Sequence, residues 1–414
     1  MRAIIRNHKV RSSALGYSIS FLLIVGLVAS GVLFIASANK RIEWHYSLRE
    51  HVLMDNYMSL LYGSKSPKNG TQTLVHSSGD TSHITTKNWG AYRVVVSETR
   101  HPSWSSTRAA IVGYVAEDPL AALYVPDRRQ TIKLCGKTKL EGTIYVPERG
   151  LERGYLTGKN FAFDKLLDGI LKKSEKRLPP LADWVKEEEF EHYREQSELI
   201  EWFDHDSTFS FSQKTRMISS KKPMYIRQHL AGNLVLHSFD SVVVFNEAKL
   251  ENILIIAPYV RFESGFKGSV QVIANEQVLC EKNVRLLYPS TIILHEEKAI
   301  RGGFPRFVRL EEGAQVLGGI LLKSDQPNGR NPLRLEINHG LVAGLVYNTG
   351  ETELKGSVIG HVYTSSFDLQ AGGGKYGNYL LDATISSKQL PNEFISPLWL
   401  KNQKGTEPKI LSCF

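Results

Sequence analysis

The sequence predicts a mainly β protein that begins with one membrane-spanning helix. Two observations support this fold class: an uncharged apolar run near the N-terminus, and short β-branched runs in the C-terminal half with glycines at matching positions. The apolar run predicts a transmembrane helix that continues as a stalk. The repeated runs predict a parallel β-helix (β-solenoid) with a helical insertion.

The apolar run covers residues 15–38, and no charged residue occurs between Arg11 and Lys40. A spanning helix needs about 20 predominantly apolar residues, so this run is long enough. A cleaved secretory signal is the nearest alternative, but its apolar core has only about 7–15 residues. A buried core helix is the other alternative. We therefore expect residues 15–38 to lie in membrane lipid.

The charges on either side of the run predict its orientation. Four Lys or Arg and no Asp or Glu precede it, whereas Lys40 and Arg41 are soon followed by acidic residues. Positive charge gathers on the cytoplasmic side of membrane helices. The sequence thus predicts a cytoplasmic tail at 1–14, a single span in the cytoplasmic (inner) membrane, and an extracytoplasmic C-terminal domain.

Shifts in composition divide the rest of the chain. Apolar residues at helical spacing predict a helical stalk at 39–62. Strand-like runs broken by Gly, Ser and Asn then predict a β-rich region at 63–160. The remaining segments are a helical insertion at 161–222, a β-solenoid at 223–370 and a C-terminal cap at 371–414. Within the insertion, Asp183 is expected to cap a helix that runs to Phe203, and the cap is expected to cover the open end of the stack.

The repeat is a seven-residue pattern, G-x-V-x-G-x-V, which occurs twice with starts 16 residues apart. A third copy at 314–320 has Ala in place of the first Gly. Alternation puts the valines of each copy on one face, and His361 on the other face, toward solvent. A β-sandwich is the alternative, because its strands also recur at short intervals. The repeat residues are Gly340, Val342, Gly344, Val346, Gly356, Val358, Gly360 and Val362.

These repeats resemble those of the bactofilins, a group of polymer-forming β-helix proteins. Bactofilins are small, cytoplasmic or cytoplasm-facing, and almost entirely repeat. This chain differs because it is expected to face outward and because its repeats are interrupted. The resemblance therefore implies a shared architecture and not membership of the group.

The N-terminal helix resembles that of type IV pilins and pseudopilins, which leave the membrane and continue as an amphipathic stalk. Gly16-Tyr17-Ser18-Ile19 follows a basic segment, as in a prepilin leader. The resemblance makes Gly16 and Tyr17 a candidate processing site. Those families carry a Glu at the fifth mature position, where this chain has Phe21. An ordinary anchor helix with a coiled-coil-like extension is the alternative.

Composition and motifs argue against several classes of function. The chain has 51 Lys and Arg against 42 Asp and Glu, and four of the basic residues lie in the tail. The remaining bias is too small to predict nucleic-acid binding. No HExxH, GxSxG, phosphate loop or dinucleotide-binding glycine set occurs, so we expect no enzyme, and no catalytic, cofactor or metal site. Asp204-His205-Asp206 and His295-Glu296-Glu297 are interpreted as solvated surface.

The cysteines add little to this picture. Cys135, Cys280 and Cys413 have no metal-ligand spacing and are too few for a disulfide scaffold, although one bridge could form between Cys135 and Cys280.

The sequence therefore favours a single-pass envelope protein with a structural or assembly role, as a pilus-like or secretion-apparatus component. It would form homo- or hetero-oligomers through its stalk or its solenoid. The alternative is a membrane-anchored β-helix that binds carbohydrate or cleaves polysaccharide, where two acids would flank the scissile bond.

Overall fold

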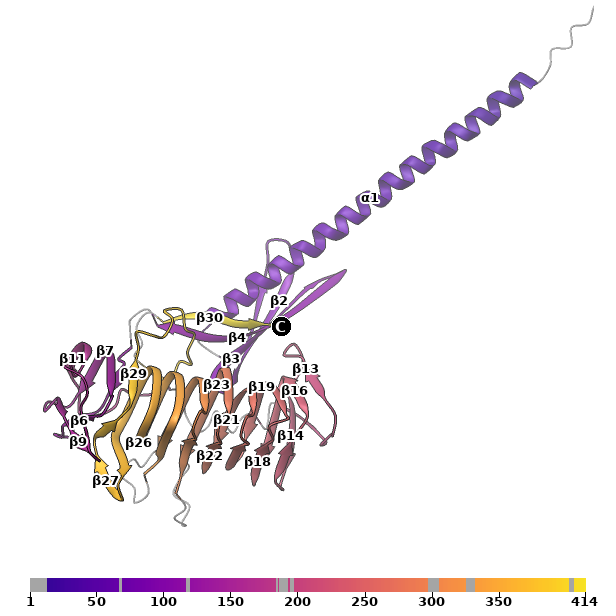
Figure 1. The fold of residues 1–414 in the computed structure, drawn as a ribbon. Coiled ribbons are helices and arrows are strands. Elements are labelled where there is room, and N and C mark those ends of the chain that lie inside the picture. The colour runs from indigo at the N-terminus through magenta and orange to yellow at the C-terminus, as the bar shows by residue number, and fades with distance from the viewer. Residues whose placement is uncertain are drawn as a thin grey trace, which may run out of the picture.

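The computed structural model describes residues 13–66, 69–116, 120–183, 185, 193, 197–296, 305–324, 332–401 and 406–414. It is mainly β, with one long apolar helix at the N-terminus and a large parallel sheet (Figure 1). This confirms the predicted class at that level of detail.

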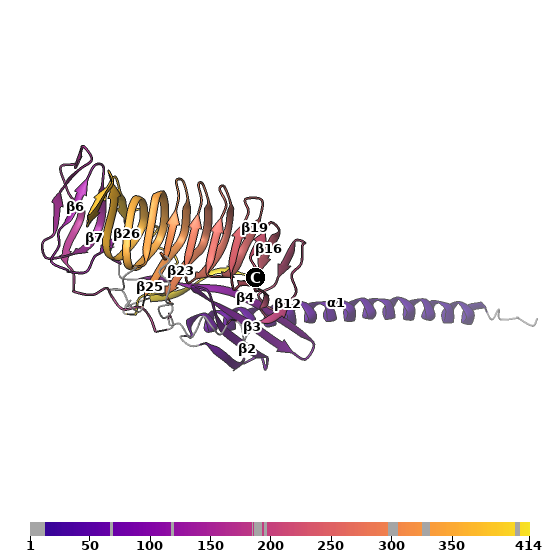
Figure 2. The same ribbon diagram turned by 90° about the horizontal axis from the view of Figure 1, so that it is seen from below.

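Helix α1 (Ser13–Lys65) is one uninterrupted helix of 53 residues that projects far from the β body (Figures 1 and 2). Its length and apolarity are sufficient to cross a membrane. No proline occurs within it and its glycines are spaced apart, so nothing in the sequence breaks it between the apolar run and the stalk.

The last quarter of α1 is packed on an antiparallel sheet and is not a free stalk. Val52 and Leu60 are fully buried there, together with the polar side chains of Asn56 and Ser59. Gly63 lets the helix approach the sheet, because a Cβ at this position would lie 2.5 Å from Ile84 Cγ2. The predicted stalk at 39–62 is therefore helical, but its second half belongs to the β body.

The antiparallel sheet has the strand order β1-β2-β3-β4-β30. Its last strand comes from the C-terminus of the chain and pairs with β4, so the two ends of the β region meet in one sheet. The strands are β1 (Gly70–Val75), β2 (Thr81–Trp89), β3 (Tyr92–His101), β4 (Trp104–Ala116) and β30 (Thr406–Cys413).

The second part of the body, which we call the parallel stack, is a row of parallel strands (Figure 2). Its strands are β5 (Leu123–Tyr124), β7 (Lys139–Val146), β11 (Asp168–Lys173), β12 (Glu198–Ile200), β13 (Ser207–Phe209), β14 (Arg216–Ser220), β15 (Met224–Ile226), β16 (His229–Gly232), β17 (Leu234–Ser238), β18 (Ser241–Val244), β19 (Lys249–Ile256), β20 (Tyr259–Phe262), β21 (Lys267–Ala274), β22 (Gln277–Cys280), β23 (Arg285–Glu296), β24 (Phe307–Leu310), β25 (Gln315–Ser324), β26 (Arg334–Ala371) and β29 (Thr384–Ser386).

Six short strands complete the structure. β6 (Ile132–Cys135), β8 (Leu151–Arg153) and β28 (Tyr379–Leu381) form a small parallel sheet, and β9 (Tyr155–Leu156) pairs with β10 (Lys159–Asn160). β27 (Gly374–Gly377) folds back on the end of β26 in an antiparallel hairpin.

One column of aliphatic side chains runs through the interior of the parallel stack, and we call it the interior ladder. The strand registers place its members opposite one another, and Gly360 over Gly344 implies the same for Val362 and Val346, both in β26. All except the two end members are buried. Its members, in spatial order, are Ile200, Ile218, Leu236, Ile255, Val272, Ile292, Ile320, Val346, Val362, Leu123, Ile144 and Leu171.

The order of strands in space departs from their order in the chain. β26 pairs with β5 and β29, and both of these pair with β7, which pairs with β11. Segments of the predicted β-rich region thus extend the parallel stack beyond its C-terminal strands. The strands of 63–160 are divided among the antiparallel sheet, the parallel stack and two small sheets, so this range is not one unit.

The predicted helical insertion at 161–222 is wrong over its described residues, apart from Tyr193, which is helical. Strands β11, β12, β13 and β14 occupy parts of this range. The helical pattern fails at β12 because Ile200 pairs with Ile218 and enters the interior ladder, so tertiary packing outweighs the helical periodicity. Residues 184, 186–192 and 194–196 of the expected helix lie outside the described residues.

The predicted cap at 371–414 does not cover an end of the parallel stack. β29 is a strand of the stack, and β30 is an edge of the antiparallel sheet. Between them Trp399 is fully buried against the side of the stack, close to Gly319. The tail therefore covers a lateral face, because its apolar side chains match the surface of β25 and not the terminal strand.

Candidate functional site

The glycines of the repeat lie directly over one another on neighbouring strands. Gly318 is opposite Gly344 in the register of β25 and β26, and a Cβ on Gly360 would overlap the backbone of Gly344. All three have positive φ, at 147°, 130° and 140°. Only glycine adopts this conformation without strain, and only glycine leaves room for the next strand.

The valines of the repeat are all in the apolar core. Val342 and Val346 are 0% exposed, and Val358 and Val362 are 1% exposed. Gly340 and Gly356 are in close contact, since a Cβ on Gly356 would overlap the carbonyl oxygen of Gly340. These glycines and valines shape the stack and carry no reactive group, so they are structural elements.

The expectation that His361 faces solvent is wrong. Its side chain points away from the interior ladder but is half-buried, and its ring Nδ1 lies 3.1 Å from the carbonyl oxygen of Ala121. Burial lowers the pKa of His361 to about 4. Alternation determines that His361 lies on the face opposite the valines. What packs against that face is the segment containing Ala121, which is distant in the sequence.

Gly16 and Tyr17 lie in the first turns of α1, and Tyr17 is 76% exposed. A Cβ on Gly16 would meet nothing within 4 Å. The position is accessible on all sides in the isolated chain.

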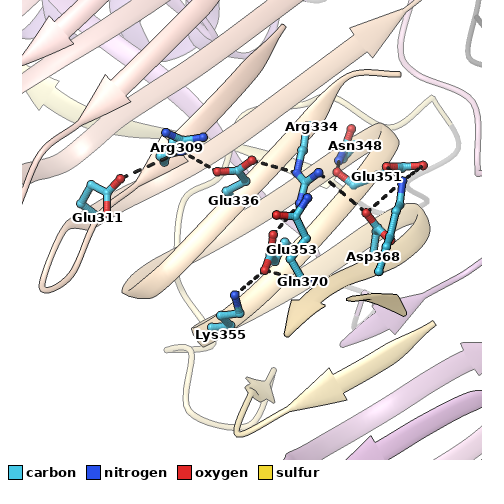
Figure 3. A network of polar contacts seen from close by, with 11 residues as sticks. Arg309, Glu311, Arg334, Glu336, Asn348, Glu351, Glu353, Lys355, Asp368 and Gln370 are labelled. Atoms are coloured by element: carbon cyan, nitrogen blue, oxygen red, sulfur yellow. Dashed lines mark hydrogen bonds and ion pairs between the residues drawn. The ribbon is translucent and has the colours of Figure 1, made fainter. Parts of the chain in front are cut away.

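The most extensive charged cluster on the parallel stack is a row of ion pairs across β24 and β26 (Figure 3). Arg334 is at its centre: its Nη2 lies 2.6 Å from Glu353 Oε2 and its Nε lies 2.8 Å from Glu336 Oε1. Glu336 also accepts from Arg309 at 2.5 Å. Lys355 holds the second oxygen of Glu353 at 2.5 Å.

A second branch of this cluster joins the hairpin β26–β27. Lys375, on β27, lies 3.1 Å from both Asp368 and Glu351. Arg334 Nη1 is 3.8 Å from Asp368. Two arginines and two lysines are thus matched against carboxylates on neighbouring strands.

The two most buried carboxyls of the cluster have pKa values shifted in opposite directions. Burial raises the pKa of Asp368, and the hydrogen bond from Lys375 offsets this only in part. Burial also acts on Glu353, but hydrogen bonds from Lys355 and Arg334 outweigh it and lower its pKa. Opposite shifts in a pair of acids are typical of glycoside hydrolysis.

Exposure argues against that chemistry here. The side chains of Asp368 and Glu353 are 4% and 5% exposed, and each is in contact with cations. A polysaccharide could not reach either carboxyl without displacing those cations. The ion pairs of this cluster therefore hold neighbouring strands of the parallel stack together.

The other candidate groups named from the sequence also have structural partners. Asp204 accepts from Gln228 Nε2 and Asp206 accepts from the backbone N–H of His229, each at 2.8 Å. His295 is only 5% exposed in β23, so the interpretation of this group as solvated surface is wrong for His295, and Glu297 lies outside the described residues. Within the described ranges no three His, Cys, Asp or Glu side chains are placed to hold a metal ion. Cys135 and Cys280 are buried free thiols, and Cys413 is an exposed one.

One constellation escaped the sequence analysis: an Asp-His-Ser chain where α1 meets the antiparallel sheet. Asp55 Oδ1 is 3.5 Å from His76 Nδ1, and His76 Nε2 is 2.7 Å from Ser82 Oγ and 3.0 Å from Ser59 Oγ. This order matches a hydrolytic triad. Both serines are 0% exposed, so no substrate reaches them. The Asp-His-Ser hydrogen bonds therefore connect helix α1 to the antiparallel sheet.

A tyrosine ladder on the outer face of the stack was also not expected. Tyr347, Tyr363, Tyr124 and Tyr145 stack in sequence with ring centroids 6.4, 5.7 and 5.5 Å apart. Tyr347 Oη donates to the carbonyl of Pro179, which ties the segment before residue 183 across the stack. No local signal predicts this ladder, because its members come from distant parts of the chain.

No family model matches this chain, and no curated protein matches it. Among solved structures, the competence-associated pilin ComZ from Thermus thermophilus is similar at 12% sequence identity. The alignment covers 90% of this chain and 95% of that chain, with a TM-score of 0.25. A TM-score of this size does not establish a common fold.

Proposed function

We propose that this protein is a single-pass, membrane-anchored structural component of the cell envelope. Helix α1 crosses the cytoplasmic membrane and holds the β body outside the cytoplasm, where the parallel stack forms a β-helix. The protein serves in an assembly, as a pilus-like or secretion-apparatus subunit.

The observation that supports this proposal most directly is the exposure of the apolar half of α1. Leu22, Leu23, Leu27 and Phe34 are between 67% and 77% exposed. Burying such side chains away from water is worth roughly 1.5–3 kcal/mol each, so a helix of this kind requires an apolar environment. A lipid bilayer about 30 Å thick matches the length of residues 15–38.

The second support is the continuity of this helix with the body. Helix α1 continues from its apolar half onto the antiparallel sheet without a linker. Contact with the sheet begins near Arg49, whose guanidinium lies over the ring of Trp104. The body is therefore held close to the membrane at a fixed angle. Rigid attachment suits a protein that positions its neighbours, as subunits of an assembly do.

The described residues favour a structural role over carbohydrate cleavage. The acids that could act as a pair are covered and neutralised, and the Asp-His-Ser chain is inaccessible. The two conspicuous polar clusters tie strands together and tie the helix to a sheet.

Membrane anchoring is tested by carbonate extraction, and orientation by protease treatment of spheroplasts. Full-length protein should resist carbonate, and protease should remove everything beyond roughly Arg41. A variant that lacks residues 1–38 keeps every helix residue that packs on the sheet, so it should fold and become soluble. Carbonate-extractable full-length protein, or a body protected in spheroplasts where an outward-facing control is digested, would contradict the proposal.

The pilus-like role is tested by the mature N-terminus. Mass spectrometry should find Tyr17 as the first residue, N-methylated, if the chain is processed as prepilins are. An intact Met1, or a cleavage elsewhere, would leave the membrane anchor in place but remove the pilus-like role.

A further inference from the structure

The two ends of the parallel stack differ in charge. At one end, the exposed residues Lys165, Lys172, Lys173, Lys176 and Arg177 surround β11, and we call this the basic end. At the other, the exposed residues Glu198, Glu201, Asp204 and Asp206 lie at and after β12, and we call this the acidic end. β11 and β13, the strand that follows β12, lie at opposite extremes of the body (Figure 1).

The basic end leaves an open strand edge. All six residues of β11 are exposed, and among the described residues β11 pairs with β7 and with no other strand. Leu171 continues the interior ladder from Ile144 but has no further strand beside it, and it is 52% exposed. An exposed edge of this kind, with apolar side chains, is a template for pairing with another strand.

The acidic end also has an exposed strand, β12, with apolar side chains. β12 pairs in parallel with β14, and its Leu199 is 62% exposed. Ile200 is the last member of the interior ladder at this end. Because every strand of the ladder is parallel, a strand added at either end keeps the same direction and the same register of inward side chains.

The charge difference is large enough to select this orientation. The exposed residues of 164–177 include five Lys and Arg against three Asp and Glu, whereas those of 197–206 include four Asp and Glu and no Lys or Arg. Like ends repel and unlike ends attract, so contact of two copies through the same end is disfavoured.

We propose that the basic end of one copy binds the acidic end of a second copy, with β11 pairing in parallel with β12. In this arrangement Leu171 lies beside Ile200 of the partner copy, and the interior ladder continues from one copy into the next. The proposal specifies the contact for the assembly role proposed above and rests on that role for its setting in the envelope.

The contact joins two different surfaces, so each dimer keeps one free basic end and one free acidic end. Such a head-to-tail contact continues as an open row of copies unless the rotation between copies closes it into a ring. Its strength should fall as salt increases, because exposed charges are screened beyond about 10 Å at 0.1 M ionic strength.

Cysteine cross-linking tests the contact in full-length protein held in nanodiscs. Leu171→Cys and Ile200→Cys are made separately in a Cys413→Ser background, which removes the exposed native thiol. Neighbouring strands bring these positions within disulfide range, so mild oxidation of the mixture should give a covalent dimer. Either variant alone should give at least tenfold less dimer. Equal cross-linking of Leu171→Cys alone would overturn the proposal, because the basic ends would then meet each other.

Sedimentation of full-length protein in detergent gives a second, independent test. Wild type should form larger species as concentration rises at low salt, and Leu171→Asp should weaken this association at least tenfold. Tyr259→Asp is the matched control, since Tyr259 is 37% exposed in β20, in the middle of the stack. Wild type that stays monomeric, or Leu171→Asp that associates as wild type does, would overturn the proposal.

The two proposals fail in different ways. Membrane retention of Leu171→Asp, measured by carbonate extraction, should equal that of wild type. Loss of retention in wild type would contradict the membrane anchor and leave the association in detergent unaffected.

Discussion

The tetrapeptide Gly-Leu-Val-Ala occurs at 26–29 in helix α1 and again at 340–343 in strand β26. In the helix Val28 is 59% exposed, whereas in the strand Val342 is fully buried. The difference arises from what surrounds each copy. The first lies in an unbroken apolar run, which gives a helix with no polar face. The second alternates between two faces, one of which packs on parallel neighbours.

The two copies show that four residues do not decide either secondary structure or burial. The two copies therefore predict different effects of the same substitution: one on the stability of the β body, the other on membrane insertion. In the proposed membrane span a new side chain would face lipid, whereas in the strand it would contact fixed protein neighbours.

The largest expected effect is the destabilisation caused by a charge at Val342 compared with a charge at Val28. Val342→Asp buries an unpaired carboxylate in the core and should destabilise the β body by about 4 kcal/mol or more. Val28→Asp should leave the unfolding of the body unchanged and instead oppose membrane insertion by about 3 kcal/mol. Urea unfolding in detergent measures the first effect and carbonate extraction the second. Equal urea midpoints for Val342→Asp and Val28→Asp would contradict the prediction that only Val342 lies in the folded core.

A second difference between helix and strand concerns their glycines, Gly26 and Gly344. Gly344→Val should cost about 3 kcal/mol, because its φ of 130° strains any L side chain and its Cβ would overlap the backbone of Gly318. Gly26→Val should change unfolding by less than about 0.5 kcal/mol, since a Cβ there meets nothing within 4 Å. Urea midpoints of both variants check this. A Gly344→Val protein as stable as wild type would mean that the strand accepts a side chain there.

The outer face of the same strand predicts a dependence on pH through His361. Its folded pKa of about 4 is below the unfolded value of about 6.5, so the unfolded chain binds more protons between these values. His361 should therefore destabilise the protein as pH falls from about 6.5 to about 4, by roughly 2–3 kcal/mol. Urea unfolding of wild type against His361→Gln across this range isolates the contribution. A constant difference between the two proteins would show that His361 is not buried in its neutral form.

The smallest effect concerns the end of α1 that is packed on the sheet. Gly63→Ala places a methyl group 2.5 Å from Ile84 Cγ2 and 2.7 Å from Val95 Cγ1, and should cost about 1–2 kcal/mol. Gly31→Ala, in the exposed half, is the matched control and should be neutral or slightly favourable in a helix. Thermal unfolding of both variants compares them. A neutral Gly63→Ala would indicate that the sheet yields at this contact.

The sequence predicted the features that depend on pattern within one segment. The long apolar run predicts α1 at once, because 24 consecutive uncharged residues have few alternatives. Alternation in 340–346 and 356–362 predicts which valines share a face. These patterns involve neighbours along the chain, which sequence alone displays.

Features that depend on distant segments were missed. Glu198–Ile200 follows an acidic, helix-like stretch, yet it pairs with β14 because Ile200 fits the interior ladder. β30 joins β4 across almost the whole length of the chain. Asp55, His76 and Ser82 converge from a helix, a turn and a strand, and no spacing in the sequence signals their contact.

The sequence by itself determined that residues 15–38 form an apolar helix and that the repeat valines lie on one face of their strands. Both follow from local periodicity and from the cost of exposing apolar surface to water. Only the tertiary structure decided that His361 is half-buried, that β11 ends the parallel stack, and that the C-terminus closes the antiparallel sheet. Those outcomes depend on where the chain returns in space, because a strand is stabilised by the neighbour it pairs with and not by its own residues alone.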